Sequence, residues 1–171
     1  EALDCSLSCE LRISDGEAFS PKQVLAILRG NGRDILTCER ILLNLLGRLC
    51  GVATWTQAHV SLIANLETKL YDTRKTTPGW RRVEKYATRC GGAMNHRSSL
   101  YEAIMVKDNH LACDAHETGK LLSPSEVVRK LREFCKNSDD TKPDTIIEIE
   151  VDTLEQLEDA LDAQPDIVLL D

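Results

Sequence analysis

The C-terminal half of the chain alternates short apolar runs with helix-start signals, and this alternation restricts the possible folds most strongly. Apolar runs at 103–106 and 167–170, and the isoleucine-rich segment 146–151, predict strands. The motifs Ser123-Pro124-Ser125-Glu126 and Thr153-Leu154-Glu155-Gln156 are capping boxes, and each predicts the start of a helix. Because strands that alternate with helices pair in parallel through right-handed crossovers, we expect an α/β fold with a parallel sheet.

The N-terminal half has a different pattern. Short strands are predicted within residues 1–30, followed by a helix over about 34–49 that Gly51 is expected to end. This helix carries apolar residues on two sides, so we expect both sides to be buried. Beyond Gly51 the pattern predicts a helix at 54–67, a short strand at 69–71 and a helix after Pro78.

Ionisable residues lie at the C-terminal ends of four predicted strands. They are Arg74 and Lys75 after 69–71, Lys107 after 103–106, Glu150 near the end of 146–151, and Asp171 after 167–170. This edge of an α/β sheet is where ligands bind, although charges also collect at strand ends simply because these meet solvent. The two acids opposite a cationic set would suit a magnesium ion that carries a polyphosphate.

The cationic residues are concentrated in the middle of the sequence. From Lys69 to Asp108 there are nine basic and four acidic residues, a balance of 9 − 4 = +5 in a chain whose net charge is −7. A basic region in an acidic protein favours a site for small, multiply anionic ligands. Nucleic acid is the disfavoured alternative, because only 4% of the residues are aromatic and the overall charge would repel a long polyanion.

Seven cysteines without a C-x-x-C pair predict reduced thiols and a cytoplasmic location. No apolar run approaches the length that spans a bilayer, and no cationic-then-apolar leader is visible at the first residues. His110, Cys113 and His116 have a spacing that could resemble a zinc site. Three such residues in one short turn rarely close a structural zinc site, so we do not predict one.

Two further interpretations concern the basic segment. Arg81, Arg82, Lys85 and Arg89 are expected to form a solvated face of the helix after Pro78. His96 by itself could be a structural histidine, but its position beside Arg97 favours a binding role.

A series of short motifs, in order along nearly the whole chain, resembles the carboxylating quinolinate phosphoribosyltransferases, also called nicotinate-nucleotide pyrophosphorylases. The motifs are Glu39-Arg40 with Leu43-Asn44, Gly51-Val52-Ala53-Thr54, Asp72-Thr73-Arg74-Lys75-Thr76-Thr77-Pro78-Gly79, Glu84-Lys85-Tyr86-Ala87, Gly91-Gly92, Asn95-His96-Arg97, Lys107-Asp108-Asn109-His110, Ile149-Glu150-Val151 and Leu169-Leu170-Asp171. Each motif alone is weak, whereas the whole series in register is a strong signal. The chain departs from the family at Cys50, where serine is usual.

The resemblance implies a type II phosphoribosyltransferase fold. This α/β fold has a mixed α/β N-terminal domain, here residues 1–51, followed by an open, incomplete α/β barrel, here residues 52–171. The family continues past Asp171 with glycine-rich loops that bind the ribose 5-phosphate, so we expect the chain to be partial at both ends. The implied reaction joins quinolinate to phosphoribosyl pyrophosphate with Mg²⁺, and gives nicotinate mononucleotide, pyrophosphate and CO₂ in NAD synthesis.

The resemblance also implies roles for single residues. The quinolinate carboxylates would be held by Arg40, Arg74, His96 and Arg97, with Arg40 contributed by the partner subunit in a homodimer or larger homo-oligomer. Thr73 and Lys75 belong to the same binding loop, and Lys75 and Lys107 would face substrate anions. Glu150 and Asp171 would hold the ribose and magnesium end of the second substrate. The catalytic set would be Lys75, Lys107, Glu150 and Asp171, acting by position and charge without a nucleophile.

Two other functions stay open at the sequence level. One is a relative without catalytic activity that binds or senses a dicarboxylate. The other is a phosphoribosyltransferase that acts on a different aromatic acid. The presence of both Glu150 and Asp171 favours an enzyme, because a dicarboxylate-binding protein has no use for a magnesium site.

Overall fold

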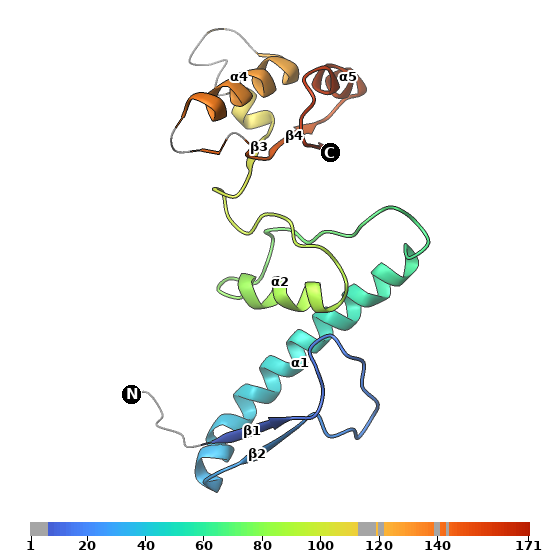
Figure 1. Ribbon diagram of the computed structural model, residues 1–171, viewed down its shortest axis with the longest axis vertical. Coiled ribbons are helices and arrows are strands. Elements are labelled where there is room, and N and C mark those ends of the chain that lie inside the picture. The colour runs from blue at the N-terminus through green and yellow to red at the C-terminus, as the bar shows by residue number, and fades with distance from the viewer. Residues whose placement is uncertain (1–6, 113–118, 120–121, 139–140, 143) are drawn as a thin grey trace. The chain divides into compact units, whose positions relative to one another are not determined.

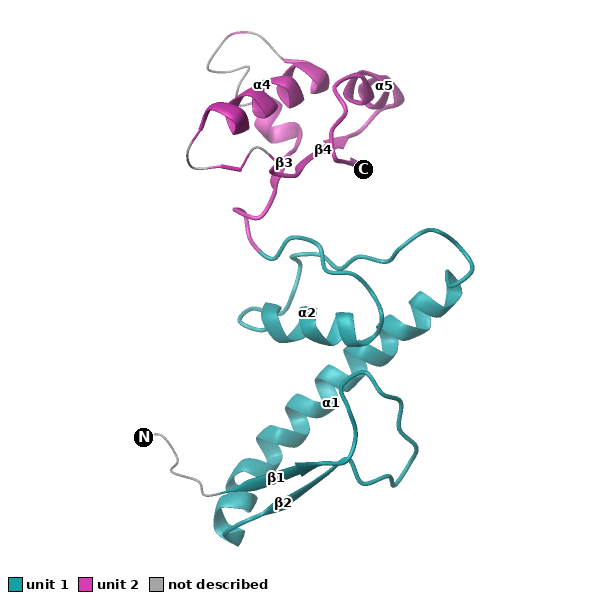
Figure 2. Cartoon of the chain, viewed as in Figure 1, with its two compact units in different colours: residues 1–98 teal, residues 99–171 magenta. Residues whose placement is uncertain are grey.

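The computed structural model describes residues 7–112, 119, 122–138, 141–142 and 144–171. Contacts within the chain divide it into two units, residues 1–98 and residues 99–171, shown in teal and magenta in Figure 2. The domains predicted from the resemblance, 1–51 and 52–171, follow a different criterion and stay a prediction.

Unit 1 begins with a hairpin that leads into a long helix (Figure 1). Strands β1 (Ser8–Leu11) and β2 (Ala26–Arg29) pair antiparallel, with Ser8 opposite Arg29. Helix α1 spans Gly32–Leu62, and its N-cap Asn31 accepts a hydrogen bond at 2.9 Å from a backbone N–H in the first turn. The strands expected within residues 1–30 are therefore confirmed.

Helix α1 passes through Gly51 without a break, so the prediction that Gly51 ends one helix and that a second follows is wrong. A glycine inside a helix costs only about 1 kcal/mol relative to alanine, which favourable packing on either side can offset. That packing comes from α2 (Arg81–Cys90), which lies against α1 (Figure 1). The contact includes Thr56, which is buried, and Gly91 directly after α2.

The apolar sides of α1 are largely exposed in the single chain. Thr56 is buried in this helix, and Ile35, Leu45, Leu49 and Val60 are half-buried. Other large aliphatic residues of the helix, among them Leu36, Ile41, Leu42, Leu43 and Leu46, are exposed. The expected burial of α1 on two sides is therefore not met within the described part of this chain. The strand predicted at 69–71 is reduced to a single parallel bridge between Tyr71 and Met94.

Unit 2 is a three-stranded parallel sheet with helices packed on one face. The strands are β3 (Ile104–Val106), β4 (Ile147–Val151) and β5 (Ile167–Leu170), in the order β3-β4-β5. The helices are α4 (Pro124–Asn137) and α5 (Leu154–Asp162). The predicted parallel α/β arrangement is confirmed, and the sheet is open.

Both predicted helix starts occur, with one difference. At α4 the capping box is complete, since the Ser123 side chain accepts from the N–H of Glu126 and the Glu126 carboxylate accepts from the N–H of Ser123. At α5 the Thr153 side chain accepts from the N–H of Gln156, but the Gln156 side chain accepts from Asp152 instead of Thr153. The second motif therefore caps its helix without forming the reciprocal bond.

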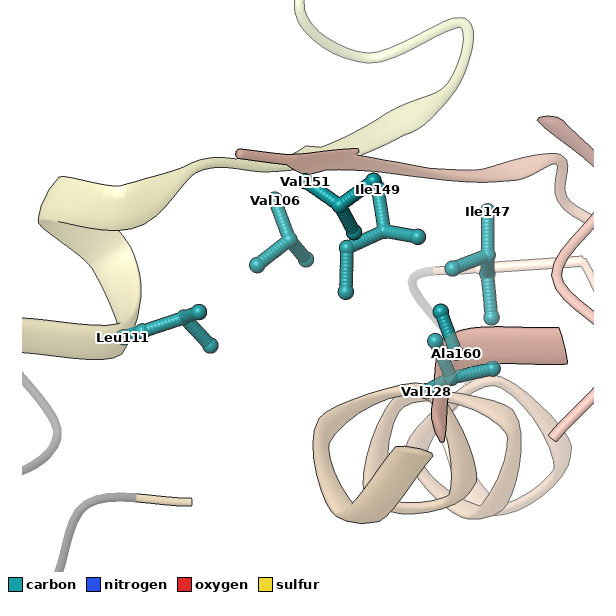
Figure 3. Packing of buried hydrophobic residues seen from close by; sticks show 7 residues of the cluster. All are labelled: Val106, Leu111, Val128, Ile147, Ile149, Val151 and Ala160. Atoms are coloured by element: carbon teal, nitrogen blue, oxygen red, sulfur yellow. The ribbon is translucent and has the colours of Figure 1, made fainter. Parts of the chain in front are cut away.

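The core of unit 2 fixes the direction of the side chains along β4. Ile147, Ile149 and Val151 point toward Val128 of α4 and Ala160 of α5 (Figure 3). Because successive side chains of a strand point to opposite faces, Glu150 lies on the face turned away from this core. The same alternation thus positions a candidate site residue.

None of the described helices combines the length and apolar character that crossing a membrane requires.

Candidate active site

Two segments of unit 1 run side by side and carry four of the residues predicted to bind substrate, namely Arg74, Lys75, His96 and Arg97. We call residues 72–79 the binding loop and residues 94–97 the facing segment. The bridge between Tyr71 and Met94 joins them, with the N–H of Asp72 donating to Met94 O at 3.1 Å and the N–H of Met94 donating to Leu70 O at 2.8 Å. The bridge therefore brings the segment with Arg74 next to the segment with His96 and Arg97.

Asp72, the first residue of the binding loop, receives three hydrogen bonds. Its Oδ1 accepts from Lys85 Nζ at 2.5 Å and from the N–H of His96 at 2.8 Å. Its Oδ2 accepts from Asn95 Nδ2 at 2.7 Å. These bonds tie the loop to the facing segment and both to α2.

The rest of the binding loop is held by the polar side of α2. Glu84 is buried, and its carboxylate accepts from the Thr77 N–H at 3.1 Å and from the Thr77 hydroxyl at 2.7 Å. Arg81 donates from its guanidinium to the hydroxyl of Thr76 at 3.4 Å and to the carbonyl oxygen of Arg74 at 3.3 Å. Helix α2 thus determines the path of the backbone that presents Arg74.

The prediction of a solvated face at Arg81, Arg82, Lys85 and Arg89 is wrong for two of its members. Lys85 is only 5% exposed and its ammonium group is bonded to Asp72 and to His96 O. Arg81 is half-buried against the binding loop. The reason is that oxygen atoms from other segments of the chain bind these cations. The helical periodicity of the sequence cannot reveal such partners. Arg82 and Arg89 are exposed as predicted.

The side chains of the binding loop differ in their surroundings. Arg74 is half-buried, and its Nε is a buried donor without a hydrogen-bond partner among the described residues. The Thr73 hydroxyl accepts from the N–H of Lys75 at 3.1 Å, which shapes the turn. Thr73 and Lys75 are exposed and line a hollow of about 170 Å³. Its other lining residues are Arg48, Val52, Asp72, Thr76, Glu84, Lys85 and Thr88.

The facing segment holds His96 and Arg97, which are both half-buried and both in contact with other groups of the chain. The backbone of His96 is fixed on two sides, because its N–H donates to Asp72 and its carbonyl accepts from Lys85 at 2.8 Å. Arg40 lies apart from this segment in the sequence, exposed on α1. Its predicted role in a partner's site stays a prediction.

A second group of charged residues lies at the C-terminal edge of the sheet in unit 2. Lys107 directly follows β3, Glu150 lies opposite Leu169 near the end of β4, and Asp171 follows β5. Lys107 Nζ forms an ion pair with Glu150, and the N–H of Asp171 donates to Val151 O at 3.2 Å. The parallel register therefore gathers all three predicted residues.

The charge state of Lys107 follows from these neighbours. The hydrogen bond that the Lys107 ammonium donates to Glu150 raises the pKa of Lys107 above its ordinary value. The negative charges of Glu150, Asp171 and Asp108 raise it further, against the opposing effect of desolvation. Lys107 is therefore a cation at neutral pH, which suits the binding of an anion and not proton abstraction.

Glu150 and Asp171 are the two carboxylates that could hold magnesium at this edge of the sheet. Among the described residues there is no group of three or more His, Cys, Asp or Glu that could hold a metal ion. Mg²⁺ commonly takes one or two carboxylates and completes its shell with water and substrate phosphates. Two carboxylates beside a protonated lysine fit an ion that arrives with a phosphorylated substrate, and they do not fit a fully protein-bound metal.

Of the three residues with a possible zinc spacing, Cys113 and His116 lie outside the described residues. His110 Nδ1 accepts a hydrogen bond from the N–H of Lys107 at 2.9 Å. This bond gives His110 a local structural role in the turn after β3.

Sequence reasoning missed the residues that hold the binding loop, namely Arg48, Asp72, Arg81, Glu84 and Lys85. A signal was present in α2, where Arg81, Glu84, Lys85 and Thr88 have the spacing of one helix side. Such a stripe of mixed charge resembles a solvated surface. The structure shows that it is a buried polar contact instead.

Comparisons with known proteins agree along the whole chain. The model of the quinolinate phosphoribosyl transferase C-terminal domain matches residues 52–171, and the model of the N-terminal domain of the same family matches residues 1–50. A probable nicotinate-nucleotide pyrophosphorylase (carboxylating) from Synechocystis is 40% identical over all of this chain and 54% of its own length. A protein of the same description from Bacillus subtilis is 39% identical over 99% of this chain.

Solved structures give the same result. The nicotinate-nucleotide pyrophosphorylase from Francisella tularensis superposes with a TM-score of 0.82 at 38% identity, covering 98% of this chain and 54% of that one. NadC from Streptococcus pyogenes superposes with a TM-score of 0.81 at 36% identity. The chain thus spans about half the length of the relatives it matches.

Proposed function

The chain belongs to the quinolinate phosphoribosyltransferase family, and we propose that the complete protein converts quinolinate and phosphoribosyl pyrophosphate to nicotinate mononucleotide, pyrophosphate and CO₂. The observation that carries the proposal is the pairing of the binding loop with the facing segment, which places Arg74 and Lys75 beside the segment of His96 and Arg97. Relatives that match the whole chain are named for this activity.

Quinolinate carries two carboxylates on neighbouring ring carbons, so its recognition requires several cations on one side of the ring. Guanidinium groups bind carboxylates through two parallel hydrogen bonds, which suits Arg74 and Arg97. The buried Nε of Arg74 lacks a partner within the described chain and supports this assignment. His96 and Lys75 would add donors, and Thr73 shapes the loop that carries them.

The second substrate is assigned to the charged group of unit 2. Lys107, held as a cation by Glu150, would bind phosphate oxygens. Glu150 and Asp171 would hold the ribose hydroxyls and a magnesium ion that arrives with the pyrophosphate. When bound, Mg²⁺ would neutralise the negative charge that develops on the departing pyrophosphate.

The chemistry needs placement and charge more than a nucleophilic side chain. The quinolinate ring nitrogen forms a bond to C1 of the ribose as the bond from C1 to pyrophosphate breaks. The 2-carboxylate then leaves as CO₂, its electron pair stays on C2 beside the positive ring nitrogen, and a proton takes its place. Lys75, Arg74 and Arg97 would orient the dianion for the first step, and cations near C2 would stabilise the charge in the second.

We further propose a homodimer or larger homo-oligomer in which Arg40 reaches the quinolinate site of a partner subunit. The exposed aliphatic residues around Arg40 on α1, among them Ile41, Leu42 and Leu43, support a contact there. A cytoplasmic location is also proposed, because Cys9, Cys38, Cys50, Cys90 and Cys135 are free thiols of the kind found in reducing compartments.

The function is tested by incubating the full-length protein with quinolinate, phosphoribosyl pyrophosphate and Mg²⁺, and separating the products by chromatography. Nicotinate mononucleotide should form only when all three are present. A product from nicotinate but not from quinolinate would assign the protein to another aromatic acid. Calorimetric binding of quinolinate with no product would identify a dicarboxylate-binding relative.

A further inference from the structure

Lys85 and Asp72 form a buried ion pair close to the predicted binding residues, and neither side chain is assigned a role by the proposed reaction. The two side chains are 6% and 9% exposed, and Lys85 Nζ lies 2.5 Å from Asp72 Oδ1. Removing two charges from water costs free energy that their attraction often only offsets, so such a pair is weak evidence of stabilisation. Its hydrogen-bond partners indicate a different use.

The pair holds the backbone of His96 from both sides. Asp72 accepts from the N–H of His96 at 2.8 Å, and Lys85 donates to the carbonyl oxygen of His96 at 2.8 Å. Both backbone polar groups of His96, which precedes Arg97, are therefore fixed by charged partners. Bonds to charged groups are shorter and stronger than neutral ones, so this arrangement restricts the facing segment tightly.

Asn95 completes the arrangement. Its Nδ2 donates to Asp72 Oδ2 at 2.7 Å and to the backbone carbonyl of Lys85 at 2.9 Å. The binding loop, the facing segment and α2 thus meet at one polar centre, which we call the Asp72 centre: Asp72, Lys85, Asn95 and the backbone of His96. Arg74 lies two residues after Asp72 in the binding loop, and Arg97 directly follows His96.

We infer that Lys85 and Asp72 are positioning residues for the recognition of quinolinate, fixing the distance between the loop that carries Arg74 and the segment that carries His96 and Arg97. This inference rests on the proposed function. Two carboxylates on adjacent ring carbons demand that their cationic partners be held within a fraction of an ångström. A displacement of about 1 Å can cost on the order of a hundredfold in rate.

The test compares Lys85→Met with Arg82→Met in the full-length protein. Both changes remove one positive charge from α2, but Arg82 is exposed, whereas Lys85 is bonded to Asp72 and His96. Calorimetry should show that Lys85→Met weakens quinolinate binding by about tenfold or more, while Arg82→Met changes it by less than about twofold. The KM for phosphoribosyl pyrophosphate should stay within about twofold in both variants.

A second variant removes hydrogen bonds without leaving a buried charge unpaired. Asn95→Ala deletes both Nδ2 bonds and keeps the ion pair, so it should fold and should weaken quinolinate binding by an intermediate factor, about threefold to tenfold. Amide hydrogen exchange measured without any substrate should show faster exchange at His96 in both Lys85→Met and Asn95→Ala.

The inference is overturned if Lys85→Met and Asn95→Ala bind quinolinate as tightly as Arg82→Met. It is equally overturned if the affinities for both substrates fall together, because that indicates general damage to the fold. Failure of the proposed function would look different: the parent protein would form no nicotinate mononucleotide, while the exchange rate of the His96 amide would still report on the Asp72 centre.

Discussion

Glu84 links three parts of unit 1 through one carboxylate. Arg48 of α1 donates to its Oε1 at 2.9 Å, and the hydroxyl and N–H of Thr77 donate to its two oxygens. The hydrogen bond from Arg48, followed by that from Thr77, holds the pKa of Glu84 below its ordinary value of 4.5 despite burial. The charged form is therefore the form that holds the binding loop.

A dependence of stability on pH follows from this shift. Because the pKa of Glu84 is lower in the folded protein, its contribution is fully present above about pH 4.5 and is lost as the pH falls through the folded value. Thermal unfolding should show that Glu84→Gln melts at a lower temperature than the parent at pH 7. The difference should shrink as the pH falls toward about 3. A difference that stays constant over this range would show that the charge of Glu84 is not what stabilises the loop.

Arg74 is the residue at which bidentate binding of a carboxylate can be tested. Its guanidinium can bind a carboxylate with two parallel bonds, whereas a lysine ammonium is a point charge. We predict that Arg74→Lys weakens quinolinate binding by about 1–3 kcal/mol in calorimetry. Arg82→Lys, the same exchange at an exposed position of α2, is the control and should have no effect. Equal affinities in both variants would exclude a bidentate contact at Arg74.

At the scale of elements, the contact between α1 and α2 determines where the binding loop is anchored. Gly91, directly after α2, lies so close to α1 that an added Cβ would be 2.5 Å from Ala53 O and 2.6 Å from Thr56 Cβ. Only glycine fits at this position, because any Cβ atom would clash with the backbone and side chain of α1. Gly51, on α1 itself, has nothing within 4 Å of such a Cβ.

The two glycines therefore predict opposite effects of the same substitution. Gly91→Ala should destabilise the protein by about 1–3 kcal/mol because the helices must move apart. Gly51→Ala should stabilise it by about 0.5–1 kcal/mol, since alanine is the better residue inside a continuous helix. Chemical denaturation measures both. A destabilising Gly51→Ala would indicate that α1 is interrupted at this position or covered by another surface.

The elements of unit 2 could be predicted from the sequence because their signals are local. The capping motifs at Ser123 and Thr153 and the β-branched residues of 147–151 each act within a few residues. The continuity of α1 could not be predicted, since it depends on packing against α2. The loop residues Arg74 and Lys75 were found by their motif, whereas the buried state of Lys85 depends on Asp72, thirteen positions earlier.

At the scale of the whole molecule, we propose that a second copy of the chain completes the site. We predict that an Arg40→Ala protein and an Arg97→Ala protein, each inactive alone, regain activity when mixed. About half of randomly reassorted dimers would be mixed and each would carry one intact site, so recovery should approach roughly a quarter of the parental activity. Subunit exchange is verified by mass spectrometry. An absence of recovery after exchange would place Arg40 outside the partner's site.

We propose above all that the complete protein couples transfer of the phosphoribosyl group to the loss of one carboxylate. The most direct measurement uses quinolinate labelled with ¹³C in its 2-carboxylate, incubated with the full-length protein, phosphoribosyl pyrophosphate and Mg²⁺. Labelled CO₂ and unlabelled nicotinate mononucleotide are then quantified by mass spectrometry. We predict that they form in equal amounts. Binding of quinolinate without labelled CO₂, or a nucleotide product that keeps the label, would contradict the claim.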